Sequence, residues 1–327
     1  MQKNKFSFIL LIFFSISAFL SAETFRVSKM HTLEIQQDIN SEAKAILGIN
    51  ESLAIFLPTD KEFIEGIEIK MDIPDTIAEW MDSVACSVYD NVKPKPSTTQ
   101  IDYSANRQFV STLPGRLSWV LQIPFIKNNS FKENKYTTKM DTIPNLSQNV
   151  IFIRLQPIMK GIPEETSNSK IKITVKPVFL NKGKLNLKLN SKEELQPCSI
   201  YIDDKSVPFS EKTQDIILDT GIHNISIISE TYRNEVRTVR IDQAKTTSLL
   251  IEMKSIEPTL IVIAPEGANV TLDNEDFTNF NTEIPISEGE HKINFSIGNY
   301  EISKTINVIK GKTYTANFTI DVEISEE

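Results

Sequence analysis

Residues on which catalytic and metal sites usually depend are scarce in this sequence. Its 327 residues include three histidines and two cysteines. The two cysteines form no closely spaced pair of the kind that binds zinc, and a nucleophile activated by histidine has only His31, His223 and His291 to draw on. No glycine-rich phosphate loop is present either. We therefore expect a protein without a catalytic site, a cofactor or a bound metal.

Long apolar runs are missing except at the N-terminus. Residues 1–22 carry two lysines, Lys3 and Lys5, near their start, continue with about fourteen apolar residues and end on Ala22. This run is shorter than the ~20 residues of a membrane-spanning helix, and its order of basic, apolar and small residues is typical of a secretory signal peptide. We expect cleavage after about Ala22, a mature chain without a membrane span, and a periplasmic or extracellular location.

Basic residues are outnumbered by acidic ones. The chain has 35 Lys and Arg against 43 Asp and Glu, and removal of the two lysines of the signal peptide takes its net charge from −8 to −10. A nucleic-acid partner is disfavoured for a chain this acidic. Export places Cys86 and Cys198 in an oxidising compartment, but each also fits the position of a small buried residue, so the sequence leaves their pairing open.

Alternation of apolar and polar residues is the main pattern of the chain. In residues 67–73, apolar Ile, Ile, Met and Ile alternate with Glu, Lys and Asp. Similar runs occur at 117–123, 151–155 and 171–179. A period of two predicts strands with one buried face, and no apolar stripe of helical period competes with it for more than two turns. We predict an all-β chain in which residues 23–181 form an antiparallel β-sandwich.

Two short segments interrupt this pattern. Residues 41–47 and 74–81 are each predicted to form one or two helical turns on the surface of the sandwich. Trp80 lies in the second of them. With Tyr89 and Tyr103 it is a candidate platform on which the flat faces of sugar rings would stack.

The last part of the chain, about 140 residues, contains two copies of one unit. The matching residues are Gly221 with Gly289, His223 with His291, and Tyr232 with Tyr300, all at an offset of 68 residues. The glycines are predicted to follow tight turns, and the tyrosines to lay a ring on a small core. A histidine that recurs at one place in a scaffold is better explained by hydrogen bonding at a strand edge than by catalysis.

The second copy carries a recognisable order of short motifs. It reads Pro265-Glu266-Gly267-Ala268, then a strand with an acidic hairpin, then Ile284-Pro285, Gly289-x-His291, Gly298-Asn299-Tyr300 and Gly311-Lys312. In this order the segment from 258 to 322 resembles the PEGA domain family. The first copy, 184–253, resembles a diverged member without the Pro-Glu-Gly-Ala string. The resemblance implies two small β-sandwich domains of a kind found in extracytoplasmic and surface-layer-type proteins, with no activity of their own.

The acidic hairpin of each copy has two interpretations. Asp273-Asn274-Glu275-Asp276, and Asp203-Asp204 in the first copy, supply hard oxygens close together, as calcium requires. Asp and Asn are also strong turn formers, and no glycine-centred series of loop ligands follows. We therefore favour hairpin turns over a calcium site.

The sequence as a whole predicts an exported, non-catalytic protein of the cell envelope. Its expected role is binding or scaffolding through contacts with another envelope protein. Binding of a glycan, such as peptidoglycan or a surface polysaccharide, by the N-terminal sandwich is the alternative. A hydrolase of unrecognised type is a weaker one, since the acids are scattered over polar strand faces and turns.

Overall fold

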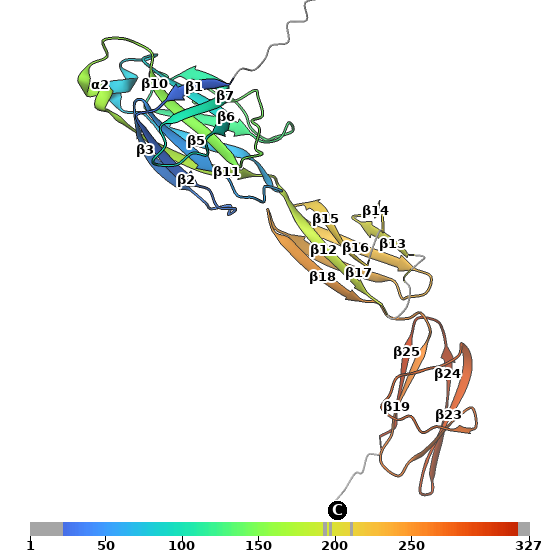
Figure 1. The fold of residues 1–327 in the computed structure, drawn as a ribbon. Helices are drawn as coiled ribbons and strands as arrows, with labels where there is room; N and C mark the ends of the chain where they lie inside the picture. The colour runs from blue at the N-terminus through green and yellow to red at the C-terminus, as the bar shows by residue number, and fades with distance from the viewer. Residues whose placement is uncertain (1–21, 192–194, 196–197, 210–211, 320–327) are drawn as a thin grey trace, which may run out of the picture. The chain divides into compact units, whose positions relative to one another are not determined.

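The chain divides into two compact units, Met1–Leu180 and Asn181–Glu327. The computed structural model describes residues 22–191, 195, 198–209 and 212–319, and apart from Ala22 the predicted signal peptide lies outside them. Strands dominate both units (Figure 1), which confirms the all-β prediction. No helix in this part of the chain has the length and apolar character needed to cross a membrane.

The first unit contains a six-stranded and a five-stranded sheet. The order of the larger sheet is β1 (Glu23–Arg26), β7 (Asp102–Thr112), β6 (Val84–Lys93), β10 (Val150–Pro157), β4 (Glu51–Phe56) and β2 (Lys29–Glu34). The order of the smaller one is β3 (Ala43–Gly48), β11 (Lys170–Phe179), β5 (Ile64–Asp72), β8 (Ser118–Pro124) and β9 (Thr137–Lys139). Neighbouring strands are antiparallel except β2 with β4 and β8 with β9.

The alternating runs of the sequence supply the core of this unit. Ile67, Ile69 and Met71 of β5 are fully buried, and Ile69 lies opposite Val175 of β11 and Leu121 of β8. Their intervening charged residues face the other way, as a period of two requires. The buried side chains of both sheets join in one cluster.

One of the two predicted helical turns is wrong. Residues 41–47 fall mostly in strand β3, in which Ala45 lies opposite Ile173 and Leu47 opposite Ile171. The pairing with β11 overrides the helix propensity of the alanines. Residues 74–81 do contain a helix, α1 (Asp75–Ala78), and a second helix, α2 (Glu164–Asn168), lies near it.

The second unit holds two modules with the same strand arrangement. The first module, residues 182–253, has the sheet β15 (Thr213–Asp219), β12 (Lys182–Asn190), β18 (Thr246–Glu252) and the sheet β14 (Lys205–Val207), β13 (Cys198–Ile202), β16 (Gly221–Ser229), β17 (Glu235–Ile241). The second module, residues 258–319, has the sheet β22 (Ile284–Pro285), β19 (Thr259–Ile263), β25 (Thr313–Asn317) and the sheet β21 (Glu275–Asp276), β20 (Asn269–Leu272), β23 (Gly289–Ile297), β24 (Tyr300–Val308).

Every strand of one module has a counterpart at the same place in the other. The two modules share even the parallel pairing of their first and last strands, β12 with β18 and β19 with β25. Each has its own hydrophobic core. The tandem repeat read from the sequence is therefore a repeat of the fold.

Candidate functional site

Both acidic hairpins are two-residue turns. Leu272 pairs with Glu275 across Asp273 and Asn274, whose φ angles are 54° and 71°. Asp203 and Asp204 take the same place in the first module, with φ angles of 49° and 62°. Successive positive φ angles are typical of hairpin turns with Asp and Asn, so the geometry fits the hairpin interpretation. Among the described residues, no group of three or more His, Cys, Asp and Glu side chains is placed to hold a metal ion.

An Asp–His pair ties this hairpin to the next strand in each module. Asp203 Oδ2 lies 2.6 Å from His223 Nδ1, and Asp273 Oδ2 lies 2.6 Å from His291 Nδ1. The other carboxylate oxygen accepts a backbone N–H from the residue after the histidine, Asn224 or Lys292, at 2.9 and 2.8 Å. Each pair thus joins the hairpin to strand β16 or β23 by two bonds.

The electrostatics of the pairs stabilise the charged form of both partners. The pKa of Asp203 is lowered by the backbone N–H of Asn224 and by His223, and that of Asp273 by His291 and the backbone N–H of Lys292. Burial lowers the pKa of His223, but the bonds to Asp203 and to a backbone carbonyl outweigh it, so the net pKa is raised. The pKa of His291 is raised mainly by Asp273.

Ser287, His291 and Asp273 lie in the order of a hydrolytic triad, with 3.2 Å between Ser287 Oγ and His291 Nε2. The same nitrogen, however, lies 2.9 Å from the carbonyl oxygen of Ser287. Both ring nitrogens therefore face acceptors and must donate, and an imidazole protonated on both sides takes no proton from serine. His223 makes the equivalent two bonds, one to Asp203 and one to the carbonyl oxygen of Asp219, which stands where the second module has Ser287. The arrangement is a structural latch of the repeat.

The third histidine belongs to a polar cluster of the first unit. His31 Nε2 lies 2.8 Å from Glu51 Oε2, which also accepts the backbone N–H of Gly48, and Lys170 Nζ donates to Glu51 Oε1 at 3.0 Å. Burial raises the pKa of Glu51, but these three donors outweigh it and hold the pKa at about 2. Since Gly48 ends β3, Glu51 begins β4 and Lys170 begins β11, the cluster fixes the junction of three strands.

The three candidate platform residues do not share a surface. Trp80 is 41 % exposed, whereas Tyr89 and Tyr103 are 0 % and 3 % exposed. Both tyrosines pack around Phe25 and Phe152 in an aromatic cluster of the core. Their faces are therefore covered, and a sugar ring has Trp80 alone of the three to stack on. Sequence position misled here, because an aromatic residue beside a polar segment was expected to be on the surface.

Neither cysteine has the character of a nucleophile. Both thiols are free. Burial raises the pKa of Cys86 to about 12 and also raises that of Cys198. A thiol must ionise to attack or to bind a metal, so both are best regarded as packing residues.

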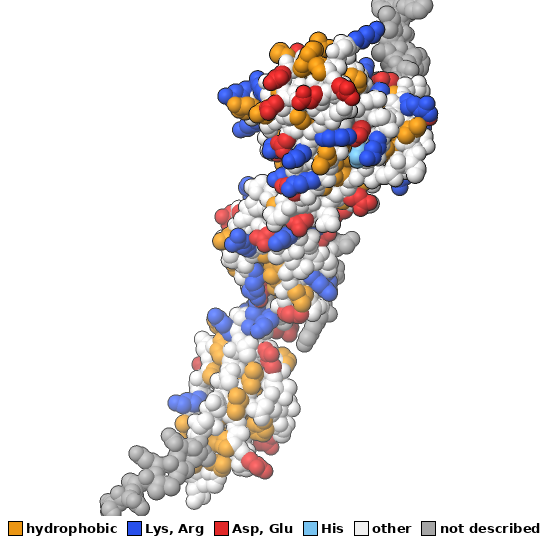
Figure 2. All heavy atoms as spheres, turned by 90° about the vertical axis from the view of Figure 1, so that its left-hand side faces the viewer, with side chains coloured by type: hydrophobic (Ala, Val, Ile, Leu, Met, Phe, Trp, Pro, Cys, Tyr) orange, Lys and Arg blue, Asp and Glu red, His pale blue; other side chains and the backbone are white. Residues whose placement is uncertain are grey.

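One cavity of the described residues is a groove in the second module. It has a volume of about 430 Å³ and lies between β24 and β25. Each of these is the last strand of its sheet, so both border the groove with an edge. Apolar side chains make up most of its lining, among them Leu260, Ile293, Phe295, Ile302, Ile306, Ala316 and Phe318. The face of this module that Figure 2 shows carries hydrophobic side chains and few charged ones.

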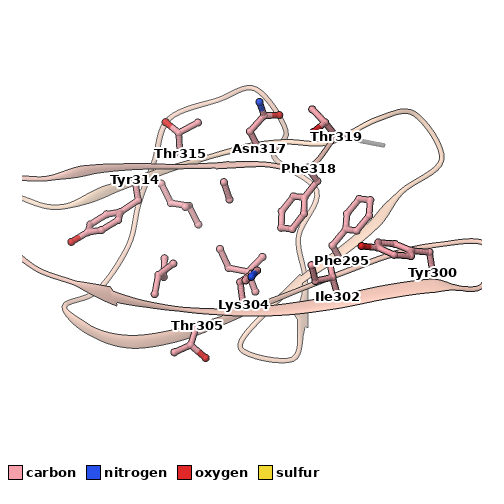
Figure 3. A pocket seen from close by; sticks show the side chains of 14 residues that line it. Phe295, Tyr300, Ile302, Lys304, Thr305, Tyr314, Thr315, Asn317, Phe318 and Thr319 are labelled. Atoms are coloured by element: carbon pink, nitrogen blue, oxygen red, sulfur yellow. The ribbon is translucent and has the colours of Figure 1, made fainter. Parts of the chain in front are cut away.

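The two ends of the groove are built differently. At one end the Tyr314 hydroxyl donates to the Asn307 carbonyl at 3.1 Å and so ties β25 to β24. At the other end Phe295 stacks on Phe318 with ring centres 4.6 Å apart, and Tyr300, 56 % exposed, lies edge-on to Phe295 (Figure 3). Between them Lys304 lines the wall (Figure 3). The Tyr300 ring thus contacts the core residue Phe295 by one edge and lies at the open end of the groove.

Matching the strand registers of the two modules shows why only one has this groove. Ala316 stands where the first module has Leu249, a half-buried side chain that packs against the core. Ile302 and Lys304 stand where it has Glu235 and Arg237. The smaller Ala316 leaves the volume that the leucine occupies in the other module. The sequence repeat carried this signal, but only in the strand register, which shifts relative to the offset of 68.

The charge in the groove also differs from that of the first module. Arg237 Nη1 lies 2.6 Å from Glu235 Oε2, so its charge is compensated on its own strand. In the second module Ile302 stands at the position of Glu235, and Lys304 forms no ion pair within the described part of the chain. The groove therefore combines apolar walls with one uncompensated positive charge.

Comparison with known proteins supports the assignment of the second module. Residues 259–323 match the model of the PEGA domain, which confirms the resemblance seen in the sequence. No curated protein matches the chain.

Two solved structures are similar to the chain at a low level. One is the Bacillus anthracis TIE protein, with 13 % identity and a TM-score of 0.25 over 91 % of this chain and 57 % of that one. The other is the pilus adhesin SpaC from Lactobacillus rhamnosus GG in its open conformation, with 7 % identity and a TM-score of 0.14 over 72 % of this chain and 33 % of that one. The chain thus spans about half and a third of their lengths, and TM-scores this low do not indicate a shared fold.

Proposed function

We propose that this chain is an exported, non-catalytic binding protein of the cell envelope, and that its PEGA module captures an extended polypeptide segment in the groove between β24 and β25. The observation that carries the proposal is the groove itself, since it is apolar, open and bordered by the edge strands of two sheets. A volume of about 430 Å³ is within the usual size of binding sites.

An extended polypeptide fits this groove better than a small molecule does. Edge strands offer rows of backbone N–H and C=O groups that pair with an added strand, while pockets for alternate side chains give specificity. Here the apolar wall between the edges supplies the pockets, and Lys304 favours a segment with an acidic residue.

The other functions considered have less support. A hydrolase would need a free base, yet His223 and His291 each face two acceptors and His31 is paired with Glu51. A glycan-binding face on the sandwich has Trp80 without Tyr89 and Tyr103 beside it. Protein binding is therefore the function that the geometry supports best.

The test is to select ligands for the groove from a random library of displayed peptides, using the full mature chain as bait. Peptides with alternating apolar residues and an acid are expected to be enriched. Ala316→Ile fills the groove with a side chain as large as Leu249, its counterpart in the first module, and should abolish their binding. Thr315→Ile is the matched control, because Thr315 lines the rim from the same strand but points away from the groove (Figure 3). Enrichment of the same peptides on the Ala316→Ile variant would contradict the proposal.

A further inference from the structure

The residues that follow the groove have the pattern of the strand that the groove would accept. Ile320, Val322 and Ile324 alternate with Asp321, Glu323 and Ser325. This period of two gives one apolar and one mainly acidic face. The described part of the chain ends at Thr319, which itself lines the groove. The segment 320–325 therefore begins where the groove is.

The length of this segment matches the groove. Six residues in extended conformation span about 17 Å from first to last, and the stretch of β25 from Tyr314 to Phe318 spans about 13 Å. Three apolar side chains on one face would thus lie along the wall formed by Ile302, Ile306 and Ala316. Filling the groove in this way would remove the exposed edges of both sheets.

Charge complementarity points to the same segment. Lys304 needs a carboxylate once the groove is filled and water is displaced. Asp321 and Glu323 flank Val322, and the long lysine stem lets the ammonium group reach the rim where these acids would lie. In the first module Glu235 satisfies the equivalent Arg237 from within, so the second module lacks an acid that this segment supplies.

The segment is poorly suited to turn back into the groove of its own chain. A tight reversal directly after Phe318 would place Thr319 and Ile320 at its corner, and β-branched residues disfavour the positive φ that many tight turns require. The one strong turn former before Ile324 is Asp321, and a turn there would leave only the last residues of the segment to enter the groove. In the first module the chain also runs on after β18, where Tyr232 forms a β-bridge with Ser255 and the Arg233 N–H donates to the Lys254 carbonyl.

We infer that residues 320–325 of one copy of this chain occupy the β24–β25 groove of a second copy, and that residues 320–325 of the second copy occupy the groove of the first. Because the donated segment starts beside the groove that receives its counterpart, a single twofold axis allows both exchanges and closes the assembly as a dimer. The inference rests on the proposed function, since it assigns the occupant of the same groove.

The first test is the oligomeric state of the full mature chain by sedimentation equilibrium. A dimer is expected, and removal of residues 320–327 should give a monomer with an unchanged melting temperature. Lys304→Glu should weaken the dimer at least tenfold, and combining it with Asp321→Lys and Glu323→Lys should restore most of the affinity. Lys312→Glu is the charge control, because Lys312 is exposed on the same module and does not line the groove.

A second measurement identifies the segment directly. A synthetic peptide of residues 319–327 should bind the chain that lacks 320–327 and fail to bind its Ala316→Ile form. A full chain that is monomeric although the truncated one binds the peptide would show that each copy fills its own groove, and would overturn the inference. A dimer that survives the truncation would overturn it as well. If the peptide fails to bind while library peptides still do, only the assignment of the occupant fails and the proposed function stands.

Discussion

The two modules of the second unit have one strand arrangement and differ in whether it is closed. In the first module Leu249 of β18 packs against the core, and β17 and β18 lie close enough for Thr247 Oγ1 to donate to the Arg240 carbonyl. In the second module Ala316 takes the place of Leu249, a groove lies between the corresponding strands, and the longer side chain of Tyr314 makes the bond that Thr247 makes in the first. The features that both modules keep, the hairpin and the Asp–His pair, are structural.

The difference shows how few substitutions separate a closed module from one with an open groove. Three positions account for it, Ala316 for Leu249, Ile302 for Glu235 and Lys304 for Arg237. Loss of one large side chain creates the volume, loss of an acid makes the wall apolar, and the same loss leaves the cation without its partner. All three lie on the last strands of the two sheets, where the rest of the core is least affected.

The largest effect is expected from a substitution that opens the closed first module. Leu249→Ala should lower the free energy of unfolding of the first module by about 1–3 kcal/mol, because it removes a half-buried side chain from the core and leaves a cavity. Hydrogen exchange measured by mass spectrometry would show faster exchange in β12, β17 and β18.

The control for this change is Leu250→Ala on the same strand. Leu250 is exposed, so its truncation should shift the stability by no more than about 0.5 kcal/mol. Equal effects of the two variants would mean that Leu249 does not close the first module.

Much of this architecture could be predicted from the sequence. Residues 67–73 alternate so regularly that their strand and its buried face followed directly, and Gly221 and Gly289 marked the repeat because both strands start with a positive φ, 137° and 126°. The prediction for residues 41–47 failed because alanine favours a helix when taken alone, and only the pairing with β11 makes these residues a strand.

The groove could not be predicted in this way. Ala316 and Leu249 are equivalent through their pairing with Val262 and Leu187. Their offset is 67 residues, so a comparison at the fixed offset of 68 does not align them. The prediction that Tyr89 belongs to a surface platform failed for a related reason, since Phe25 of β1 covers Tyr89 from a distant part of the sequence. Burial by segments far apart in the chain leaves no local signal.

The reverse experiment closes the open module. Ala316→Ile should raise the free energy of unfolding of the second module by about 0.5–2 kcal/mol, because the added side chain fills existing space. Slower hydrogen exchange in β24 and β25 would report the gain, with Thr315→Ile as the control on the outer face. A loss of stability relative to Thr315→Ile would instead indicate overpacking and a groove narrower than the first module's core.

The smallest expected effect concerns what the modules share. The pKa values of His223 and His291 are raised, so each pair's contribution is complete below the ordinary histidine value of 6.5 and is lost as pH rises through the raised pKa. The pKa values of Asp203 and Asp273 are lowered, so the contribution also requires a pH above their ordinary value of 3.8.

Both modules should therefore unfold at a higher urea concentration at about pH 5.5 than at about pH 8.5. His223→Gln should reduce this difference in the first module alone and His291→Gln in the second alone, which hydrogen exchange resolves by module. A module that keeps its full pH dependence after its histidine is replaced would show that the latch does not stabilise the repeat. Equal losses in both modules would confirm that the latch belongs to the scaffold, whereas the groove belongs to the second copy.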